Sequence, residues 1–409
     1  MNQLRKKMFF ALLLSAVIIG SSAMGWCNGE KSPAEGGLVT PNAISEVPFE
    51  FTEQSILVKA KLNNSDKEYT LVLDTGATTN VLSQKVMDEL GDTGVSSEVT
   101  GTDAANVSQT VKQIFLRSIQ VGSVEVEKCR TVILDKNPFD SYGLKADGIL
   151  GHSFLKFFTI CIDYPQNILT LSSKSDNRLK PRGYMIRLRE RSGHLTADIK
   201  IGSIKLQSVI VDTGDGGDEY LSLPMQSLER LKPELNCRLI SSIGPGVNGL
   251  YGHAEAKYSR ARTVKWGSFK VKNLPVQFWN SPHFCIANRF LSQFTVTIDY
   301  PKMLMYLLPD KNKPFKTNID SFGINVQKDE SGQVKIIGLW EGSPAEKAGL
   351  KVGDEIRNFK VNGNDCFFEE LGASLGGEVD SAFGFQVISS AGMREVELKK
   401  AELLPEILK

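Results

Sequence analysis

The fold of this chain is decided by a short pattern that occurs twice, as LVLDTG at residues 71–76 and as VIVDTG at residues 209–214. Each copy is a run of three apolar residues followed by Asp-Thr-Gly. At ordinary composition a given tripeptide occurs about 0.1 times in a chain of this length, so two copies in matching surroundings indicate a duplication. One copy alone is typical of a strand that ends in a turn, with Asp as the cap and Gly at a positive φ.

Other blocks repeat in the same order. RSIQVGS at 117–123 returns as RTVKWGS at 262–268, and the block 154–165 returns at 290–301, with about 140 residues between copies. The repeat predicts two equivalent lobes, at 48–174 and 183–308. Short apolar runs separated by Gly, Pro, Asn and Asp predict a mainly β fold, with short helices near 83–90 and 225–231. Two pseudo-symmetric β-barrel lobes are the simplest architecture.

The N-terminus has the pattern of a signal peptide. Three basic residues at 5–7 precede an apolar run at 8–20 that is short for a membrane span, and small residues at 21–23 suit cleavage. We therefore expect a signal peptide at 1–23, a flexible leader at 24–47, no membrane span in the mature chain, and a periplasmic or extracellular location. An uncleaved anchor is the alternative. A lipid anchor at Cys27 is disfavoured because the bulky Trp26 precedes it.

Composition narrows the function classes. The 409 residues are 41% hydrophobic and 23% charged, as in a globular protein, and the net charge of +1 argues against a nucleic-acid-binding protein. There are 4 His and 6 Cys, with no CxxC or HExxH motif, so no metal and no cofactor are expected. We expect the His residues at the surface or in loops, and Cys161 and Cys285 as thiols without a bridge.

The two Asp-Thr-Gly copies have a chemical use in common. A twofold arrangement of the lobes brings equivalent residues together at the axis, so Asp74 and Asp212 are expected to meet. Two carboxylates about 3 Å apart repel by roughly 5 kcal/mol at an effective dielectric constant near 20, and they therefore share one proton. One carboxylate is then a general base that activates water, and the other is an acid that protonates the substrate carbonyl.

On these residues the chain resembles the aspartic proteases of the pepsin and retroviral-protease superfamily, and looks like a bacterial member with two retropepsin-like lobes in one chain. The resemblance covers about 260 residues: LVLDTGATTNVLS at 71–83 matches the catalytic strand and loop, and DGILG at 147–151 matches the element that crosses behind it. It implies an endopeptidase with Asp74 and Asp212 as the catalytic pair, acting on peptide or protein substrates.

The resemblance also implies supporting roles. Thr75 and Thr213 tie the two catalytic loops together, the backbone of Gly76 and Gly214 supports the carboxylates, and Ala77 is the small residue that follows. The second lobe departs from the pattern. Asp215 replaces the small residue, the loop is expected to be one residue longer, and Cys-Ile-Ala at 285–287 replaces the crossing element. The alternative is a degenerate, non-catalytic relative that acts as an exported peptide-binding or scaffold protein.

Proteases of this superfamily cover their substrate with β-hairpin flaps. The candidates here are about 98–112 in the first lobe and about 242–257 in the second, where Tyr251 is the residue expected to cover the substrate. Surface loops without that role are the alternative for both segments.

A different composition begins after Leu308. A polar, Pro-bounded linker at 309–314 leads to a third unit at 319–402 with the strings SFGI, GSPA, AGL, VGDEI and VNG. Together these resemble a PDZ domain over about 80 residues, a fold of strands with short helices. By that resemblance the backbone amides of Phe322, Gly323 and Ile324 receive the carboxylate of a C-terminal peptide, which is the expected partner. A PDZ fold kept only as a packing partner is the alternative.

Overall fold

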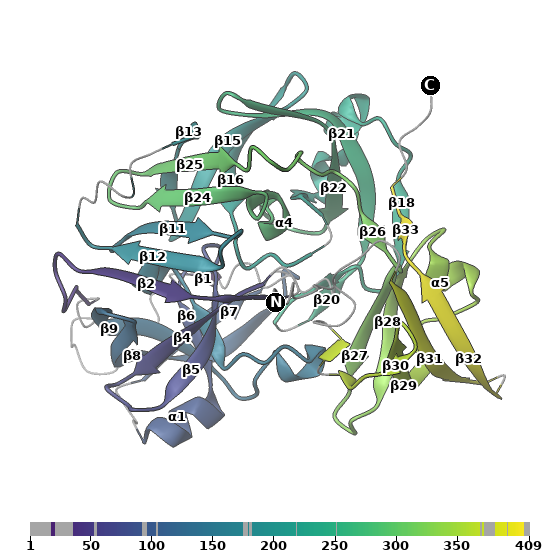
Figure 1. Ribbon diagram of the computed structural model, residues 1–409, viewed down its shortest axis with the longest axis horizontal. Helices are drawn as coiled ribbons and strands as arrows, with labels where there is room; N and C mark the ends of the chain where they lie inside the picture. The colour runs from purple at the N-terminus through teal and green to yellow at the C-terminus, as the bar shows by residue number, and fades with distance from the viewer. Residues whose placement is uncertain are drawn as a thin grey trace.

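The computed structural model describes the backbone of residues 18–20 and, in full, residues 36–52, 55–91, 96–103, 105–174, 179, 182–217, 219–250, 252–368, 370–371, 381–390 and 392–404. The described chain is mainly β, as predicted, and its strands form three large sheets and two small ones (Figure 1). Most of the predicted signal peptide and leader lies outside the described residues. Within it, the backbone of residues 18–20 pairs antiparallel with residues 100–102.

The first repeat and the strand at 18–20 together form a nine-stranded sheet. In sheet order its strands are β1 (Ile18–Gly20), β7 (Ser97–Thr102), β8 (Ser108–Val121), β9 (Val124–Leu134), β6 (Asn80–Ser83), β10 (Gly148–Leu150), β5 (Glu68–Leu73), β4 (Ser55–Leu62) and β3 (Glu50–Thr52). Strand β10 lies between β5, to which it is parallel, and β6, to which it is antiparallel. Asp74 follows the end of β5 directly, so the sheet fixes where its side chain begins.

The second repeat belongs to a sheet of fourteen strands. Its own part contains β14 (Arg189–Arg191), β15 (His194–Ile201), β16 (Ile204–Val211), β23 (Cys285–Ile286), β17 (Leu221–Pro224), β22 (Phe269–Trp279), β21 (Ala256–Trp266) and β18 (Ile240–Ile243). Strand β23 lies between the parallel β16 and the antiparallel β17. The order around Asp212 thus reproduces the order around Asp74.

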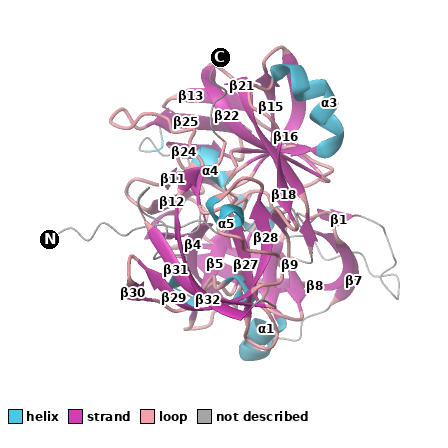
Figure 2. Ribbon diagram, turned by 90° about the vertical axis from the view of Figure 1, so that its right-hand side faces the viewer, coloured by secondary structure: helices cyan, strands magenta, loops and turns pink. Residues whose placement is uncertain are grey.

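The same sheet continues into the C-terminal unit. The continuation contains β28 (Val334–Trp340), β29 (Glu355–Val361), β31 (Ala382–Ser389) and β32 (Gly392–Lys399), with β27 (Ile324–Lys328) beside β28 and β30 (Asn364–Asp365) beside β29. The junction is the antiparallel pair β18–β28, in which Ser242 lies opposite Trp340. Figure 2 views the molecule from the side of this unit. The unit is therefore joined to the second repeat by backbone pairing as well as by the linker at 309–314.

A six-stranded sheet joins the two repeats. Its strands are β13 (Tyr184–Arg187), β25 (Leu304–Pro309), β24 (Phe294–Asp299), β11 (Thr159–Asp163), β12 (Ile168–Ser172) and β2 (Ile44–Pro48). Its central strands, β11 and β24, come from equivalent blocks of the two repeats and run antiparallel, with Cys161 opposite Thr297. Because equivalent strands pair with one another, this sheet relates the repeats by a pseudo-twofold axis.

Helices are short and stand at the ends of strands. Those that lie wholly within the described residues are α1 (Gln84–Leu90), α2 (His152–Leu155), α3 (Leu228–Leu231), α4 (Asn288–Leu291) and α5 (Pro344–Lys347), with 3₁₀ turns η1 (Asp140–Tyr142), η3 (Met225–Ser227) and η4 (Lys232–Glu234). The helices predicted near 83–90 and 225–231 are confirmed. Ser83 caps α1 by accepting from the Val86 N–H, and Gly91 ends it at a φ of 61°.

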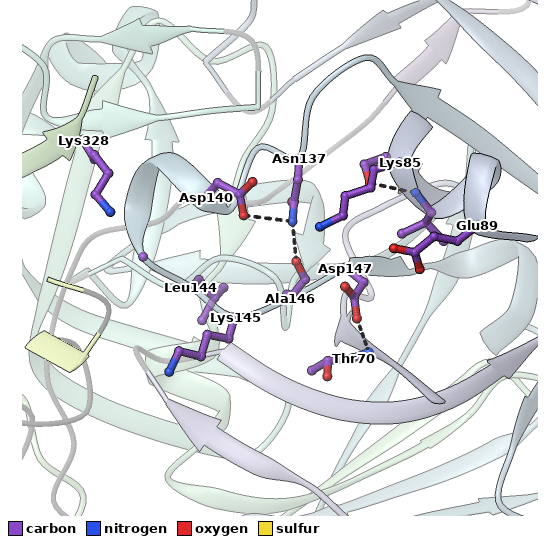
Figure 3. A pocket seen from close by; sticks show the side chains of 13 residues that line it. Thr70, Lys85, Glu89, Asn137, Asp140, Leu144, Lys145, Ala146, Asp147 and Lys328 are labelled. Atoms are coloured by element: carbon purple, nitrogen blue, oxygen red, sulfur yellow. Dashed lines mark hydrogen bonds between the residues drawn. The ribbon is translucent and has the colours of Figure 1, made fainter. Parts of the chain in front are cut away.

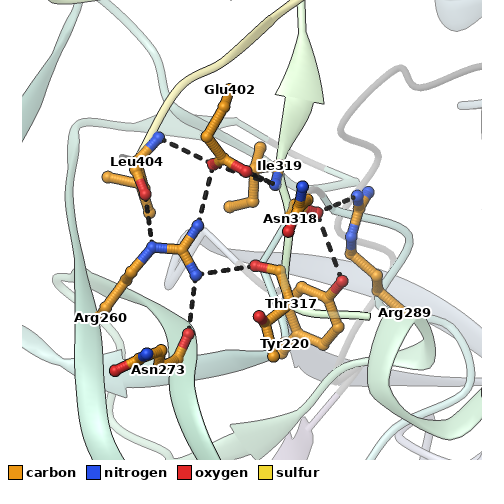
Figure 4. A network of polar contacts seen from close by, with 9 residues as sticks. All are labelled: Tyr220, Arg260, Asn273, Arg289, Thr317, Asn318, Ile319, Glu402 and Leu404. Carbon is orange, nitrogen blue, oxygen red and sulfur yellow. Dashed lines mark hydrogen bonds and ion pairs between the residues drawn. The ribbon is translucent and has the colours of Figure 1, made fainter. Parts of the chain in front are cut away.

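A buried arginine fastens the C-terminal unit to the second repeat. Arg260 of β21 has a side-chain exposure of 2%, and its Nη2 lies 2.9 Å from Oε1 of Glu402 (Figure 4). Its Nη1 donates to the carbonyl of Thr317 at 2.8 Å, and its Nε donates to the carbonyl of Leu404. The strand pair β26 (Asp320–Ser321) and β33 (Ala401–Glu402) closes the same junction. Both ends of the unit are thereby held against β21.

Candidate active site

Asp74 and Asp212 come together where the two Asp-Thr-Gly loops meet. Each follows an equivalent strand, β5 and β16, and each is fully buried, with 0% of the side chain exposed. Each also faces the other's loop: a Cβ placed on Gly76 would lie 2.3 Å from the carboxyl carbon of Asp212, and a Cβ on Gly214 would lie 2.2 Å from that of Asp74. Two glycines are therefore what lets the two carboxyl groups approach.

Each carboxylate is held by the backbone of its own loop. Oδ1 of Asp74 accepts from the N–H groups of Gly76, at 2.8 Å, and Ala77, at 2.9 Å. Oδ1 of Asp212 accepts from the equivalent N–H groups of Gly214, at 2.9 Å, and Asp215, at 3.1 Å. One oxygen of each group is thus oriented by two donors.

The two threonines cross-link the loops. Thr75 Oγ1 donates to the carbonyl of Val211 at 2.7 Å and accepts from the Thr213 N–H at 3.0 Å. Thr213 Oγ1 makes the reciprocal pair, donating to the Leu73 carbonyl at 2.8 Å and accepting from the Thr75 N–H at 3.0 Å. All four bonds are buried and run between repeats, so they hold the two Asp side chains in register.

Burial and proximity favour a retained proton. The pKa of Asp74 is raised well above its usual range, first by burial and then by the charge of Asp212, against the opposing effect of the Ala77 and Gly76 amides. Two carboxyl groups in this relation titrate as a unit, with one proton retained over a wide pH range.

The second loop is longer than the sequence comparison predicts. Ile149 of β10 pairs with Val81 of β6, whereas the equivalent Cys285 of β23 pairs with Ser222 of β17. The path from Asp74 to Val81 is 7 residues and that from Asp212 to Ser222 is 10, so the insertion is three residues and not one. The prediction was wrong because the sequence shows an apolar strand after each loop but does not show which of its residues pair with the neighbouring strand.

The extra acids turn inward. Asp215 is 0% exposed and Glu219 is 1% exposed, and Ser222 Oγ lies 3.3 Å from Oδ2 of Asp215 and 3.2 Å from Oε1 of Glu219. The sequence analysis singled out Asp215 but missed Glu219 and Ser222. A usable signal existed, because Ser222 is a polar residue inside an apolar strand whose counterpart in the first repeat is Val81.

The flap candidates contact each other. In the first, β7 and β8 form a hairpin whose tip carries Asp103, and Oδ2 of Asp103 accepts from the Gly252 N–H of the second at 3.2 Å. A Cβ on Gly252 would lie 2.8 Å from Val107. The second segment contains the small hairpin of β19 (Val247–Asn248) and β20 (His253–Ala254). Tyr251 lies outside the described residues, so its predicted role stays a prediction.

In the C-terminal unit, Phe322, Gly323 and Ile324 form the turn into β27. Gly323 has a φ of +69°, and a Cβ there would lie 2.2 Å from the Cβ of Ser343. By the resemblance stated above, the backbone amides of this turn would receive a peptide carboxylate, so a side chain at position 323 would be expected to meet the ligand. The nearest obstacle is instead the unit's own Ser343, which caps α5.

Two of the four histidines contradict the expectation of surface or loop positions. His152, in α2, and His194, in β15, are each only 3% exposed. Nδ1 of His194 lies 2.8 Å from the carbonyl oxygen of Gly76, so this side chain reaches from the second repeat to the loop that follows Asp74. Burial, and after it the charge of His283, lowers the pKa of His194 to about 4. The neutral ring donates its Nδ1–H to the Gly76 carbonyl.

A separate cavity of about 510 Å³ lies away from the Asp pair, between α1, the segment 137–147 and β27 (Figure 3). Its polar wall is internally bonded, since Asn137 Nδ2 donates to the Ala146 carbonyl at 2.7 Å and Asp147 Oδ2 accepts from the Thr70 N–H at the same distance. Across the described residues, no group of three or more His, Cys, Asp or Glu side chains suits a metal ion. No helix in that part of the chain is long and apolar enough to cross a membrane.

Comparison with known proteins bears on the first repeat. The family described as "gag-polyprotein putative aspartyl protease" matches residues 58–157 of the 409-residue chain. No curated protein matches the chain. The matched segment contains Asp74 with its loop, β10 and the β7–β8 hairpin. Residues 58–157 are therefore an aspartyl protease-like region, which indicates peptidase activity.

Proposed function

We propose that the protein is an aspartic endopeptidase whose catalytic pair is Asp74 and Asp212. The observation that carries this proposal is the joint geometry of the pair: two buried carboxyl groups, each held by two backbone amides, in loops cross-linked by Thr75 and Thr213. The family match to residues 58–157 supports the first half of the pair.

The geometry suits attack by water on a peptide carbonyl. The pair holds one proton, so its carboxylate member takes a proton from water while its protonated member donates to the carbonyl oxygen. The product of attack is a tetrahedral intermediate, which breaks down when its nitrogen is protonated and the C–N bond cleaves. No covalent bond to the protein forms in this sequence of steps.

The test is a pair of isosteric substitutions. Asp74→Asn and Asp212→Asn should each lower peptide-bond hydrolysis by about 10²–10⁴-fold, because neither remaining group can hold and transfer the shared proton alone. A peptide library at a series of acid to neutral pH values supplies substrates, and a pepstatin-like inhibitor should block the wild-type activity. Circular dichroism should show both variants folded, since Asn keeps the shape and most hydrogen bonds.

Two results would contradict the proposal. Full activity in Asp212→Asn would mean that the second repeat is not catalytic, and that two copies of Asp74 pair in a dimer or another site acts. Absence of hydrolysis by the wild type across the library and pH range would favour the alternative, an exported peptide-binding or scaffold protein.

We further propose that the C-terminal unit is a PDZ domain that binds C-terminal peptides at Phe322, Gly323 and Ile324, and that the protein is exported. The binding test uses the whole chain, because Leu403 and Leu404 pack into the core shared by the repeats. Peptides with a free carboxylate should bind more tightly than their amidated forms. Equal binding of both forms would refute the carboxylate site, and fractionation of cells tests export.

A further inference from the structure

Behind the two catalytic loops lie equivalent walls of opposite character. In the first repeat the pairing β5–β10–β6–β9 stacks three apolar residues that are at most 1% exposed: Ile149, Val81 and Val132. In the second repeat the same pairings place polar or sulfur-containing residues there: Cys285, Ser222 and Gln277. The small residue after Asp-Thr-Gly changes likewise, from Ala77 to Asp215.

Hydrogen bonding fixes the orientation of the Gln277 side-chain amide. Nε2 of Gln277 donates to the Gly246 carbonyl at 3.2 Å and to the Tyr258 hydroxyl at 3.1 Å. Its Oε1 therefore faces Ser222 Oγ, 3.3 Å away, and can only accept. The Ser222 hydroxyl has one proton, so it can donate to only one of its three neighbours, Gln277 Oε1, Asp215 Oδ2 and Glu219 Oε1.

A second donor for the contacts of Ser222 can come from the acids. Asp215 Oδ2 and Glu219 Oε1 lie 3.3 Å and 3.2 Å from the same Oγ. An ionised carboxylate only accepts, so with both acids ionised the three contacts of Ser222 share a single donor proton. One proton retained by the acids supplies a second donor and removes one of two adjacent buried charges, while the other acid keeps its charge.

The cluster touches the catalytic pair. The backbone N–H of Asp215 donates to Asp212 Oδ1 at 3.1 Å, so the side chain of Asp215 starts directly beside this carboxyl group. The titratable groups that face it are Asp212 and Asp74 at the ends of β16 and β5, Glu219 in its own loop, and Cys285 of β23. Burial raises the pKa of Asp215 well above its usual range, and the charges of Glu219 and Asp212 raise it further. Burial likewise raises the pKa of the Cys285 thiol, so that group stays neutral.

We propose that Asp215 and Glu219 are positioning residues for the catalytic pair: together they retain one proton and one negative charge beside Asp212, and that charge keeps the shared proton on the catalytic pair up to a higher pH. The proposal rests on the proposed function, because it concerns the same site. Ser222 and Gln277 hold Asp215 and Glu219 in place and connect them to the Gly246 carbonyl in the second flap candidate.

The kinetic test is the double variant Asp215→Asn/Glu219→Gln, which removes the charge and keeps the side-chain shapes. Both limbs of the pH profile of kcat/KM should move to lower pH by about one unit, since a neighbouring charge acts on both ionisations of the dyad. Asp198→Asn is the matched control. Asp198 is a carboxylate of β15 paired with Arg189 and Lys205, and its removal should leave the profile in place. A double variant whose profile overlays the wild type would refute the proposal.

A second measurement does not depend on activity. In the native protein Asp215 and Glu219 keep a proton that the unfolded chain releases above about pH 4. The free energy of unfolding should therefore fall as the pH rises through the neutral range. Urea unfolding of the wild type at pH 5 to 8 should show this slope. In the double variant, the slope of unfolding free energy against pH should be smaller by the contribution of one proton. An unchanged slope would refute the retained proton. If the wild type cleaves no peptide, the proposed function fails, while this slope still decides whether the pair holds its proton.

Discussion

The two Asp-Thr-Gly loops present the same carboxyl groups and threonines at the axis but differ in length and in the walls behind them. Both loops end a strand with Asp-Thr-Gly, bind their carboxylate with two amides and exchange threonine hydrogen bonds. Behind the first loop the wall is apolar, while behind the second it is a polar chain that includes Ser222 and Gln277. Duplicated units thus keep the geometry at their axis and diverge in what supports it.

The largest expected effect tests the shared part of the comparison. Gly76→Ala and Gly214→Ala should each lower peptide hydrolysis by about 10²-fold or more, because the new methyl group lies within 2.3 Å of the opposite carboxyl carbon and displaces it. Gly37→Ala is the control, since nothing lies within 4 Å of a Cβ there. If one of the two site variants stays fully active, the loops are not equivalent in catalysis.

The next prediction exchanges the walls. Val132→Gln should lower the unfolding free energy by about 2–5 kcal/mol, because the larger amide enters an apolar wall without partners. The reverse change, Gln277→Val, should cost only about 1–2 kcal/mol, because the Tyr258 hydroxyl keeps its bond to the Gly246 carbonyl at 3.0 Å. Denaturant titrations measure both, and equal costs would show that the walls are interchangeable.

A pH effect should distinguish the β14–β15 hairpin, whose His194 contacts Gly76 of the first repeat, from its counterpart in the first repeat. His194 corresponds to Ser55, because Thr196 pairs with Ile210 as Leu57 pairs with Val72. The pKa of His194 is lowered to about 4, so its contribution is present above pH 6.5 and is lost as pH falls toward 4. That loss amounts to about 3 kcal/mol. His194→Gln should flatten this part of the stability profile, whereas an unchanged profile would contradict the assignment.

The smallest effect compares two equivalent tyrosines. Tyr164 donates to Oδ1 of Asn288 at 2.5 Å, while the Tyr300 hydroxyl, beside His152, has no hydrogen-bond partner among the described residues. Tyr164→Phe should lower the unfolding free energy by about 1 kcal/mol, and Tyr300→Phe should change it by less than about 0.5 kcal/mol. Thermal unfolding of the two variants gives the comparison, and the opposite order would show that Tyr300 has the more important hydroxyl.

The sequence alone was informative wherever local pattern and repetition carry the physics. Three apolar residues before Asp-Thr-Gly predicted a buried strand and a tight loop, and their recurrence predicted that Asp74 and Asp212 meet. A short helix near 83–90 was likewise expected from the sequence, and the structure shows Ser83 as its cap. These features depend on neighbours in the chain, so letters are enough to find them.

Tertiary structure decided what depends on register and on contacts between distant segments. The three-residue insertion before Ser222 appeared only once Cys285 paired with that strand. The inward turn of Glu219 and the reach of His194 to Gly76 involve partners that no local pattern names. Pairing of β18 with β28 likewise joins segments about a hundred residues apart. Sequence determined which groups are present and how often they recur, whereas burial and strand pairing determined which of them share a proton.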